Sequence, residues 1–146
     1  MLNFLTKLLP VQTAYAHCDV PCGIYSSEPS KLAAKTVLVM VQKINALPIQ
    51  EDRDADAQAN FIRMVETKEE HAQLCKKELL ILWTDYFKPE HLQQFSELHD
   101  TFWQAAKLCS ENKQHISLDS AKKLVEIVDK IAQMYADTNP KPPATL

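Results

Sequence analysis

Glycine is almost absent from this chain, which has one glycine among 146 residues. Glycine supplies the positive-φ corners of tight hairpin turns and of loops that bind phosphate. A dinucleotide-binding fingerprint needs three glycines and a P-loop needs two, so the sequence excludes both. A hairpin-rich sandwich or barrel is disfavoured for the same reason. Hydrophobic residues make up 46% and charged residues 24%, as in ordinary globular domains. The composition therefore indicates one mostly helical domain.

An excess of positive charge and long apolar runs are also lacking. The formal net charge is -3 and the pI is about 5.9, so the charge gives no support to a nucleic-acid or anionic-membrane partner. No segment approaches the roughly 20 consecutive apolar residues that a bilayer-spanning helix needs. We therefore expect neither a nucleic-acid partner nor a membrane partner.

Residues 1–16 differ in composition from the rest of the chain. They carry one charge, several apolar residues and the ending Ala14-Tyr15-Ala16, and a small-x-small ending is typical of a protease processing site. The segment is short for a secretory signal, because Pro10 and Gln12 interrupt its apolar part. Two interpretations stay open: a leader removed by cleavage between Ala16 and His17, or an N-terminal arm packed on the folded domain.

The remaining chain shows four stretches in which apolar residues recur every three, four or seven positions, the spacing of a helix face. Prolines bound several of these stretches, where helices tolerate them. The expected helices are Ser30–Asn45, Asp54–Trp83, a third that begins at Pro89 and carries its face to Cys109, and Leu118–Ala136 with Ser117 as a cap. The first is apolar nearly all round, so we expect it to be the most buried. The predicted fold is an all-α, antiparallel four-helix bundle, a fold that does not settle the chemistry.

The segment from His17 to Tyr25 is the one stretch that neither helix nor core explains. It holds His17, Cys18 and Cys22 together with the only glycine, Gly23. Thiolates and imidazoles are ligands that later transition metals prefer. The cysteine spacing is not that of a zinc CxxC knuckle, and no matching second pair completes one. A metal site is one interpretation, and a Cys18–Cys22 disulfide or two inert thiols is the other.

Cleavage after Ala16 would enlarge the donor set. His17 would offer its α-amine and its imidazole, Cys18 its sulfur and its deprotonated backbone nitrogen, and Cys22 a second sulfur. Two sulfurs and two nitrogens in a plane, with an axial imidazole, favour Ni(II) or Cu(II) over zinc. Anionic thiolate and amidate donors also stabilise a higher oxidation state, so one-electron cycling becomes possible.

At these residues the sequence resembles the nickel superoxide dismutase family. HCDVPCGIY matches the family's N-terminal signature at every fixed position, and Leu82–Pro89, LWTDYFKP, is similar to a second family block. The resemblance covers residues 17–146 and implies a four-helix bundle that assembles as a homohexamer. It also implies one nickel ion per subunit. The nickel is held by an N-terminal metal-binding hook, residues 17–25, whose first residue a maturation protease exposes.

The resemblance also assigns roles to individual residues. The implied nickel ligands are His17, Cys18 and Cys22. The implied catalytic residues are Asp19 and Tyr25 in the hook and Tyr86, the two tyrosines restricting access to the metal; Asp85 would hold the hook and Lys88 would attract the substrate. The chain departs from the pattern at two positions, having Ala33 where some members place a glutamate and His71 where they place an arginine. We expect His71 to stand in as the partner that orients the axial imidazole.

The predicted function is that of an enzyme which disproportionates superoxide to dioxygen and hydrogen peroxide while nickel alternates between Ni(II) and Ni(III). A non-catalytic helical bundle that binds or handles nickel or copper is the alternative. A purely structural helical protein with a Cys18–Cys22 disulfide is a third interpretation. Because the leader resembles a maturation peptide more than an export signal, we expect a cytoplasmic location.

Overall fold

A computed structural model of the chain describes residues 23–48, 51 and 53–138. It contains four α-helices: α1 (Glu28–Asn45), α2 (Ala55–Ile81), α3 (Leu98–Gln114) and α4 (Leu118–Asp137). A π-helical turn, η3 (Leu82–Tyr86), and a 3-10 turn, η4 (Pro89–Gln93), lie between α2 and α3. The described part of the chain has no β-strand. The all-α prediction is therefore confirmed.

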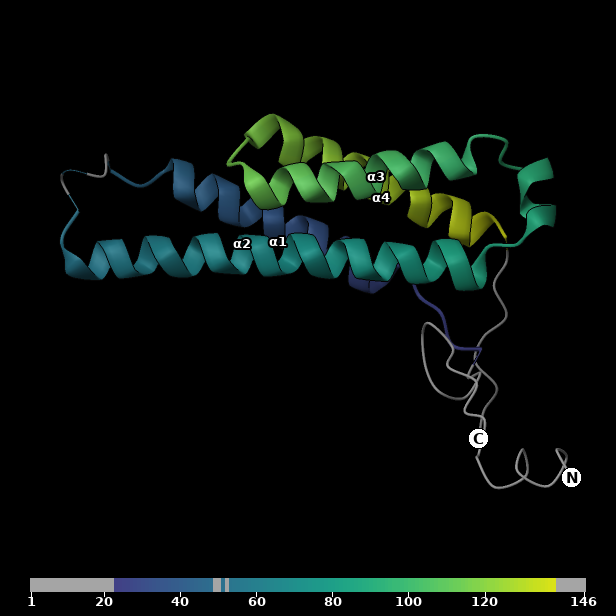
Figure 1. The fold of residues 1–146 in the computed structure, drawn as a ribbon, viewed down its shortest axis with the longest axis horizontal. Helices are drawn as coiled ribbons and strands as arrows, with labels where there is room; N and C mark the ends of the chain where they lie inside the picture. Colours follow the sequence, from purple (N-terminus) through teal and green to yellow (C-terminus); the bar gives the residue numbers. More distant parts are fainter. Residues whose placement is uncertain (1–22, 49–50, 52, 139–146) are drawn as a thin grey trace, which may run out of the picture.

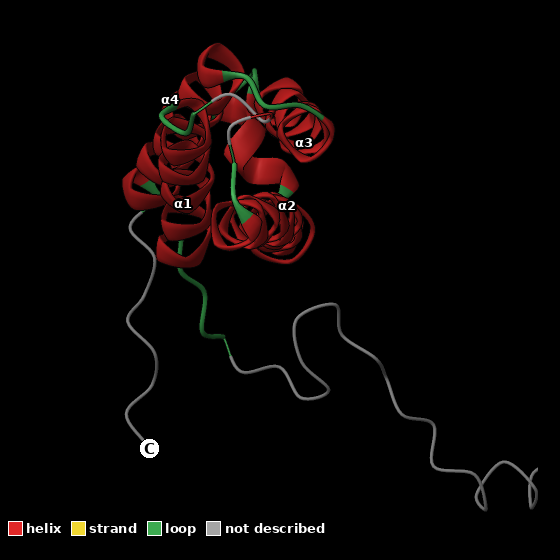
Figure 2. Cartoon of the chain, turned by 90° about the vertical axis from the view of Figure 1, so that its left-hand side faces the viewer, coloured by secondary structure: helices red, strands yellow, loops and turns green. Residues whose placement is uncertain are grey.

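The four helices run alternately in opposite directions (Figure 1), and the contacts between them close a ring. Each helix packs against two neighbours, with contacts between α1 and α2, α2 and α3, α3 and α4, and α4 and α1. Seen along the bundle, α1 and α2 form one pair and α4 and α3 the other (Figure 2). Inward side chains of all four helices form one core, which includes Val37, Leu79, Phe102 and Leu124. None of the described helices combines the length and the apolar composition that crossing a bilayer requires.

Two helix starts have the caps that their sequences favour. The Asp54 carboxylate accepts a 2.8 Å hydrogen bond from the Ala57 amide at the start of α2. Ser117 accepts a 3.2 Å hydrogen bond from the Ser120 amide at the start of α4, as predicted. Each cap satisfies an amide that the helix itself leaves without an acceptor.

The prediction that the third helix begins at Pro89 is wrong. Pro89 opens the short turn η4, and α3 begins at Leu98. Leu92 and Phe95, which have the spacing of the predicted helix face, lie in η4 and in the connection that follows it. The apolar spacing continues through this region, but the chain must reverse direction between α2 and α3. A short turn accommodates that reversal, whereas a continuous helix from Pro89 would not.

The expectation that α1 is the most buried helix fits only one of its faces. Val37 and Val41 are fully buried, but Leu32 is 69% exposed and Val39 is 42% exposed. A helix in a ring of four contacts two neighbours only, so one side of it faces outward. The apolar residues of α1 therefore divide into a core face and an exposed face.

Candidate metal centre

The predicted nickel ligands His17, Cys18 and Cys22 lie outside the described residues, as do Asp19 and the cleavage site at Ala16. The described chain begins at Gly23, directly after Cys22. Gly23 has a φ of +67°, the left-handed conformation that side chains disfavour. A Cβ placed at Gly23 would meet no atom within 4 Å, so the requirement for glycine is conformational and not steric. The only glycine thus supplies the predicted corner after the hook.

Tyr25 and Tyr86, the two tyrosines to which the resemblance assigns a common role, lie together. Tyr25 precedes α1 and Tyr86 ends η3, and their ring centroids are 5.5 Å apart. A third tyrosine, Tyr135 in the last turn of α4, lies with its ring 4.7 Å from that of Tyr86. The apolar spacing of the fourth helix places Tyr135 on its inward face. Tyr135 lies in neither HCDVPCGIY nor LWTDYFKP, so the sequence did not mark it as part of the site. The three half-buried tyrosines form a cluster at the end of the bundle where the hook joins it.

Hydrogen bonds fix the orientation of this tyrosine cluster. The Tyr135 hydroxyl donates to the Tyr25 carbonyl oxygen at 2.7 Å, and burial raises the pKa of Tyr135 above its ordinary value. The Tyr86 hydroxyl is hydrogen-bonded to Thr138 Oγ1, which lies 2.6 Å from the Tyr135 carbonyl oxygen. Because a carbonyl only accepts, the single Thr138 proton goes to it. Tyr86 is therefore the donor in its bond to Thr138.

Asp85 occupies the π-helical turn η3, directly before Tyr86. One carboxylate oxygen, Oδ1, lies 3.0 Å from the Thr84 hydroxyl. The other, Oδ2, is buried and has no hydrogen-bond partner among the described residues. Buried carboxylate oxygens are costly without donors, so this atom requires a donor from outside the described residues or from water. Single π-helical turns occur frequently at functional sites, and this one carries both Asp85 and Tyr86.

The other two predicted site residues lie in different settings. Lys88 is exposed at the start of η4, and its backbone amide donates a 3.0 Å hydrogen bond to His91 Nδ1. His71 is half-buried in α2, and its Nδ1 donates to the Thr67 carbonyl oxygen at 2.8 Å. Since Nδ1 carries the proton, Nε2 of a neutral His71 is the acceptor nitrogen. Ala33 is buried in α1.

The helical cysteines are separate from this tyrosine cluster. Cys75 and Cys109 lie on the apolar faces of α2 and α3 and are buried free thiols. Hydrogen bonding to the Cys109 thiol, together with burial, raises the pKa of Cys75 far above its ordinary value, so it stays protonated. Among residues 23–48, 51 and 53–138, no three histidine, cysteine, aspartate or glutamate side chains converge to hold a metal ion.

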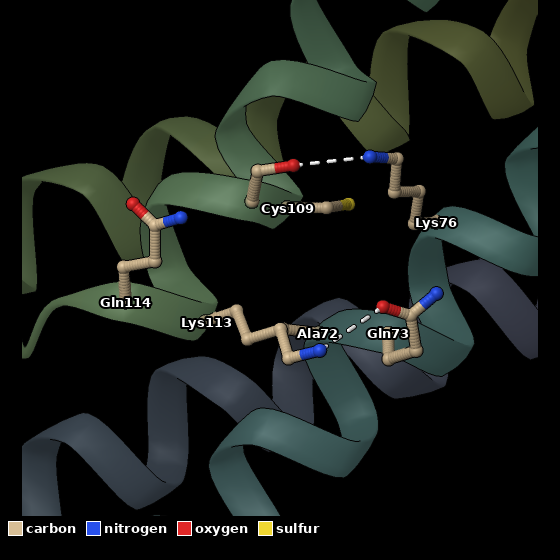
Figure 3. Close-up of a pocket in the computed structure, with 7 residues that line it drawn as sticks. Ala72, Gln73, Lys76, Cys109, Lys113 and Gln114 are labelled. Carbon is tan, nitrogen blue, oxygen red and sulfur yellow. Dashed lines mark hydrogen bonds between the residues drawn. The ribbon is translucent and has the colours of Figure 1, made fainter.

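A cavity of about 250 Å³ lies between α2 and α3, and Cys109 forms part of its wall (Figure 3). Two hydrogen bonds cross it, from Lys76 to Ser110 Oγ at 3.0 Å and from Lys113 to Gln73 Oε1 at 3.5 Å. None of the predicted site residues lines this cavity.

Comparison with known proteins supports the four-helix bundle fold. The fold and the sequence before it define a class of protein: a four-helix bundle that is preceded by a histidine- and cysteine-containing segment and has tyrosines at the adjoining end. Residues 12–139 match the sequence model of the nickel-containing superoxide dismutases. The chain belongs to this family.

Individual relatives agree with this assignment. "Superoxide dismutase [Ni]" of Streptomyces seoulensis is 33% identical over 84% of this chain and 88% of its own length. The Streptomyces coelicolor protein of the same name is 30% identical over 88% of this chain and 92% of its own. A crystal structure of a Ni-containing superoxide dismutase in the oxidized state has a TM-score of 0.73 and 31% identity, covering 86% of this chain and all of that one. The native nickel superoxide dismutase structure at 1.30 Å has a TM-score of 0.72 and 28% identity, covering 84% and 99%.

Proposed function

We propose that this chain is an enzyme that converts superoxide to dioxygen and hydrogen peroxide, using one nickel ion per subunit. The observation that carries the proposal is the extent of the family match. It spans residues 12–139 and therefore includes the whole HCDVPCGIY segment as well as LWTDYFKP. The tyrosines of the two segments, Tyr25 and Tyr86, pack against each other where the hook meets the bundle.

The donor groups of the hook fit nickel. His17 offers an amine and an imidazole, and Cys18 and Cys22 offer two thiolates and a backbone nitrogen, which are soft and borderline ligands. Nickel bound to such donors supplies one-electron chemistry between Ni(II) and Ni(III). The unpartnered Oδ2 of Asp85 gives the hook an acceptor on the bundle side, and we assign Asp85 to holding a backbone amide of that segment.

The remaining residues of the site act on the substrate or on the ligands. Tyr25 and Tyr86 narrow the approach to the hook, and Asp19 shapes the hook itself. Superoxide is an anion and the chain is net negative, so attraction requires a local positive charge, which Lys88 provides. His71 orients the His17 imidazole through its Nε2, because its Nδ1 is engaged within α2.

Maturation, assembly and location are part of the same proposal. A protease removes residues 1–16 and so frees the His17 amine, without which the ligand set is incomplete. The mature chains assemble as a homohexamer in the cytoplasm. The exposed apolar residues of α1, Leu32 and Val39, provide surface for contacts between subunits.

The decisive experiment compares superoxide dismutase activity before and after removal of residues 1–16, with intact mass and nickel content measured on the same samples. We expect activity and about one nickel per chain only after cleavage. Cys18→Ser and Cys22→Ser should each abolish both, and Cys109→Ser is the matched control because Cys109 is a buried thiol of the bundle. A cleaved, nickel-loaded protein without activity would favour the nickel- or copper-handling alternative. Retention of nickel by both hook variants would overturn the ligand assignment.

A further inference from the structure

The last turn of α4 contacts both tyrosines that flank the proposed nickel site. Tyr135 is hydrogen-bonded to the Tyr25 carbonyl, and Thr138, the C-cap residue of α4, is hydrogen-bonded to the Tyr86 hydroxyl. Neither Tyr135 nor Thr138 belongs to HCDVPCGIY or to LWTDYFKP. We propose that Tyr135 and Thr138 are positioning residues of the metal centre, which fix the hook and the Tyr86 hydroxyl against α4. The inference rests on the proposed function.

The Tyr135 bond anchors the chain directly after the hook. Tyr25 follows Cys22 by three residues, so its carbonyl is close along the backbone to the proposed ligands. The bond joins residues 110 positions apart and is 2.7 Å long. Tyr135 itself has little freedom, because its helix is held in the core by the buried Ile131 and Met134. The bond therefore fixes the backbone of Tyr25, two residues after Gly23, against a helix that is packed in the core.

The Thr138 bond decides which way the Tyr86 hydroxyl points. The Thr138 proton is used by the Tyr135 carbonyl, so Tyr86 donates its own proton to Thr138. The Tyr86 oxygen then has only lone pairs to offer to any other group. Tyr86 is thereby an acceptor toward the hook side, and it presents a fixed oxygen to water or substrate in place of a mobile hydroxyl proton.

The two bonds are coupled, because Tyr135 makes the first and its carbonyl oxygen holds Thr138 in place for the second. Its hydroxyl donates to Tyr25, its carbonyl accepts from Thr138, and its ring packs 4.7 Å from that of Tyr86. The end of α2, the turn η3 and the end of α4 lie at the same end of the bundle in Figure 1, and the segment leading into α1 enters from that side. The contact depends on α4 returning to this end, which its length of 20 residues allows.

The test uses the full chain after maturation, with Tyr135→Phe, Thr138→Val and the conservative Thr138→Ser. Tyr135→Phe keeps the ring and removes one hydroxyl, and Thr138→Val keeps the shape and removes the acceptor. Gln133→Met, on the exposed side of the same helix turn, is the control. The first readout is the rate at which nickel passes to an added chelator. We expect release about three- to tenfold faster in Tyr135→Phe, the loss of one hydrogen bond.

The second readout is the pH profile of kcat and of kcat/KM. Thr138→Val should shift the alkaline limb of the kcat profile, because it frees the Tyr86 hydroxyl, whereas Thr138→Ser should restore the profile of the unaltered enzyme. A variant that is merely less stable would leave both pH profiles unchanged, although partial unfolding by itself speeds nickel release. Values equal to those of Gln133→Met in both readouts would overturn the proposal.

A third readout separates this proposal from the proposed function. In the nickel-free protein, the ultraviolet absorbance titration of the tyrosines reports the same hydrogen bonds without any metal. We expect Thr138→Val to alter the titration of the remaining tyrosines and Thr138→Ser to preserve it. If the unaltered protein is inactive but shows this pattern, the proposed function is overturned and the roles of Tyr135 and Thr138 in positioning stand. If the protein is active and the pattern is absent, the positioning roles are overturned and the proposed function stands. Should Tyr135→Phe fail to fold, the two Thr138 variants decide the question.

Discussion

The ammonium group of Lys68 lies 3.1 Å from the carbonyl oxygen of His115, so a lysine in the middle of α2 caps the far end of α3. The same Nζ also donates to the carbonyl oxygens of Asn112 and Lys113. Lys68 is 1% exposed, and burial lowers its pKa. All three ammonium protons are therefore used on carbonyls that the end of a helix leaves without partners. Positive charge at this terminus also complements the helix dipole.

Replacing Lys68 by methionine should destabilise the protein by about 2 to 3 kcal/mol. Methionine keeps the apolar stem, but it removes the donor to the buried Asn112 carbonyl and to the partly buried carbonyls of Lys113 and His115. Urea unfolding of the nickel-free protein measures the change. Lys77→Met, an exposed position on the same helix, should change the free energy of unfolding by about 0.5 kcal/mol or less. Equal stability of the two variants would show that water, and not Lys68, satisfies the end of α3.

Lys68 also makes contacts that the sequence does not predict. The four helices could be predicted because apolar spacing and capping residues such as Ser117 are local signals. Lys68 falls on the inward stripe of α2, between Val65 and Ala72, and a lysine there contradicts the apolar pattern. Its partners lie 44, 45 and 47 residues further along the chain. No local pattern indicates that these carbonyls converge on one point.

The candidate site likewise has residues that the sequence predicts and residues that it does not. Tyr25, Asp85 and Tyr86 could be assigned from two short motifs, and the structure places the two tyrosines together. Tyr135 and Thr138 could not, because their contacts depend on how far α4 extends and where it ends. The prediction that the third helix begins at Pro89 failed for a related reason. Leu92 and Phe95 have helical spacing, but the turn of the chain between α2 and α3 is a tertiary requirement.

Asp85→Asn should loosen the nickel site without weakening the bundle. Oδ2 of Asp85 is buried and has no partner among the described residues, so the helices lose no hydrogen bond there. The hook would lose a charged acceptor, and we expect nickel to pass to a chelator about tenfold faster. Asp129→Asn, an exposed carboxylate of α4, should leave the release rate unchanged. Unchanged nickel release together with reduced stability in urea would instead assign the partner of Asp85 to the bundle.

Lys88→Glu should slow the enzyme most at low salt. The substrate is an anion, and Lys88 is an exposed positive charge two residues after Tyr86 in a chain of net charge -3. We expect kcat/KM to fall about threefold to tenfold at low ionic strength, with the difference nearly lost at about 0.5 M salt. Stopped-flow or pulsed generation of superoxide measures the rate. Lys122→Glu makes the same change in net charge in the first turns of α4, so a similar loss there would attribute the effect to overall charge.

Tyr135→Phe should flatten the loss of stability at alkaline pH. Burial raises the pKa of Tyr135 above its value of 10.0 in the unfolded chain, so the folded state holds the proton more tightly. The stability that this provides is fully present below pH 10.0, and it is lost as the pH rises from there through the higher pKa of the folded state. Phenylalanine does not titrate, so this part of the decline should disappear. Urea midpoints of the nickel-free protein, measured from about two pH units below to two above the ordinary tyrosine pKa of about 10, provide the comparison. The control is Tyr15→Phe, made in the uncleaved chain, which removes a tyrosine of the leader and should leave the alkaline loss of stability intact. Parallel stability curves for Tyr135→Phe and the unaltered protein would contradict the assignment of that loss to Tyr135.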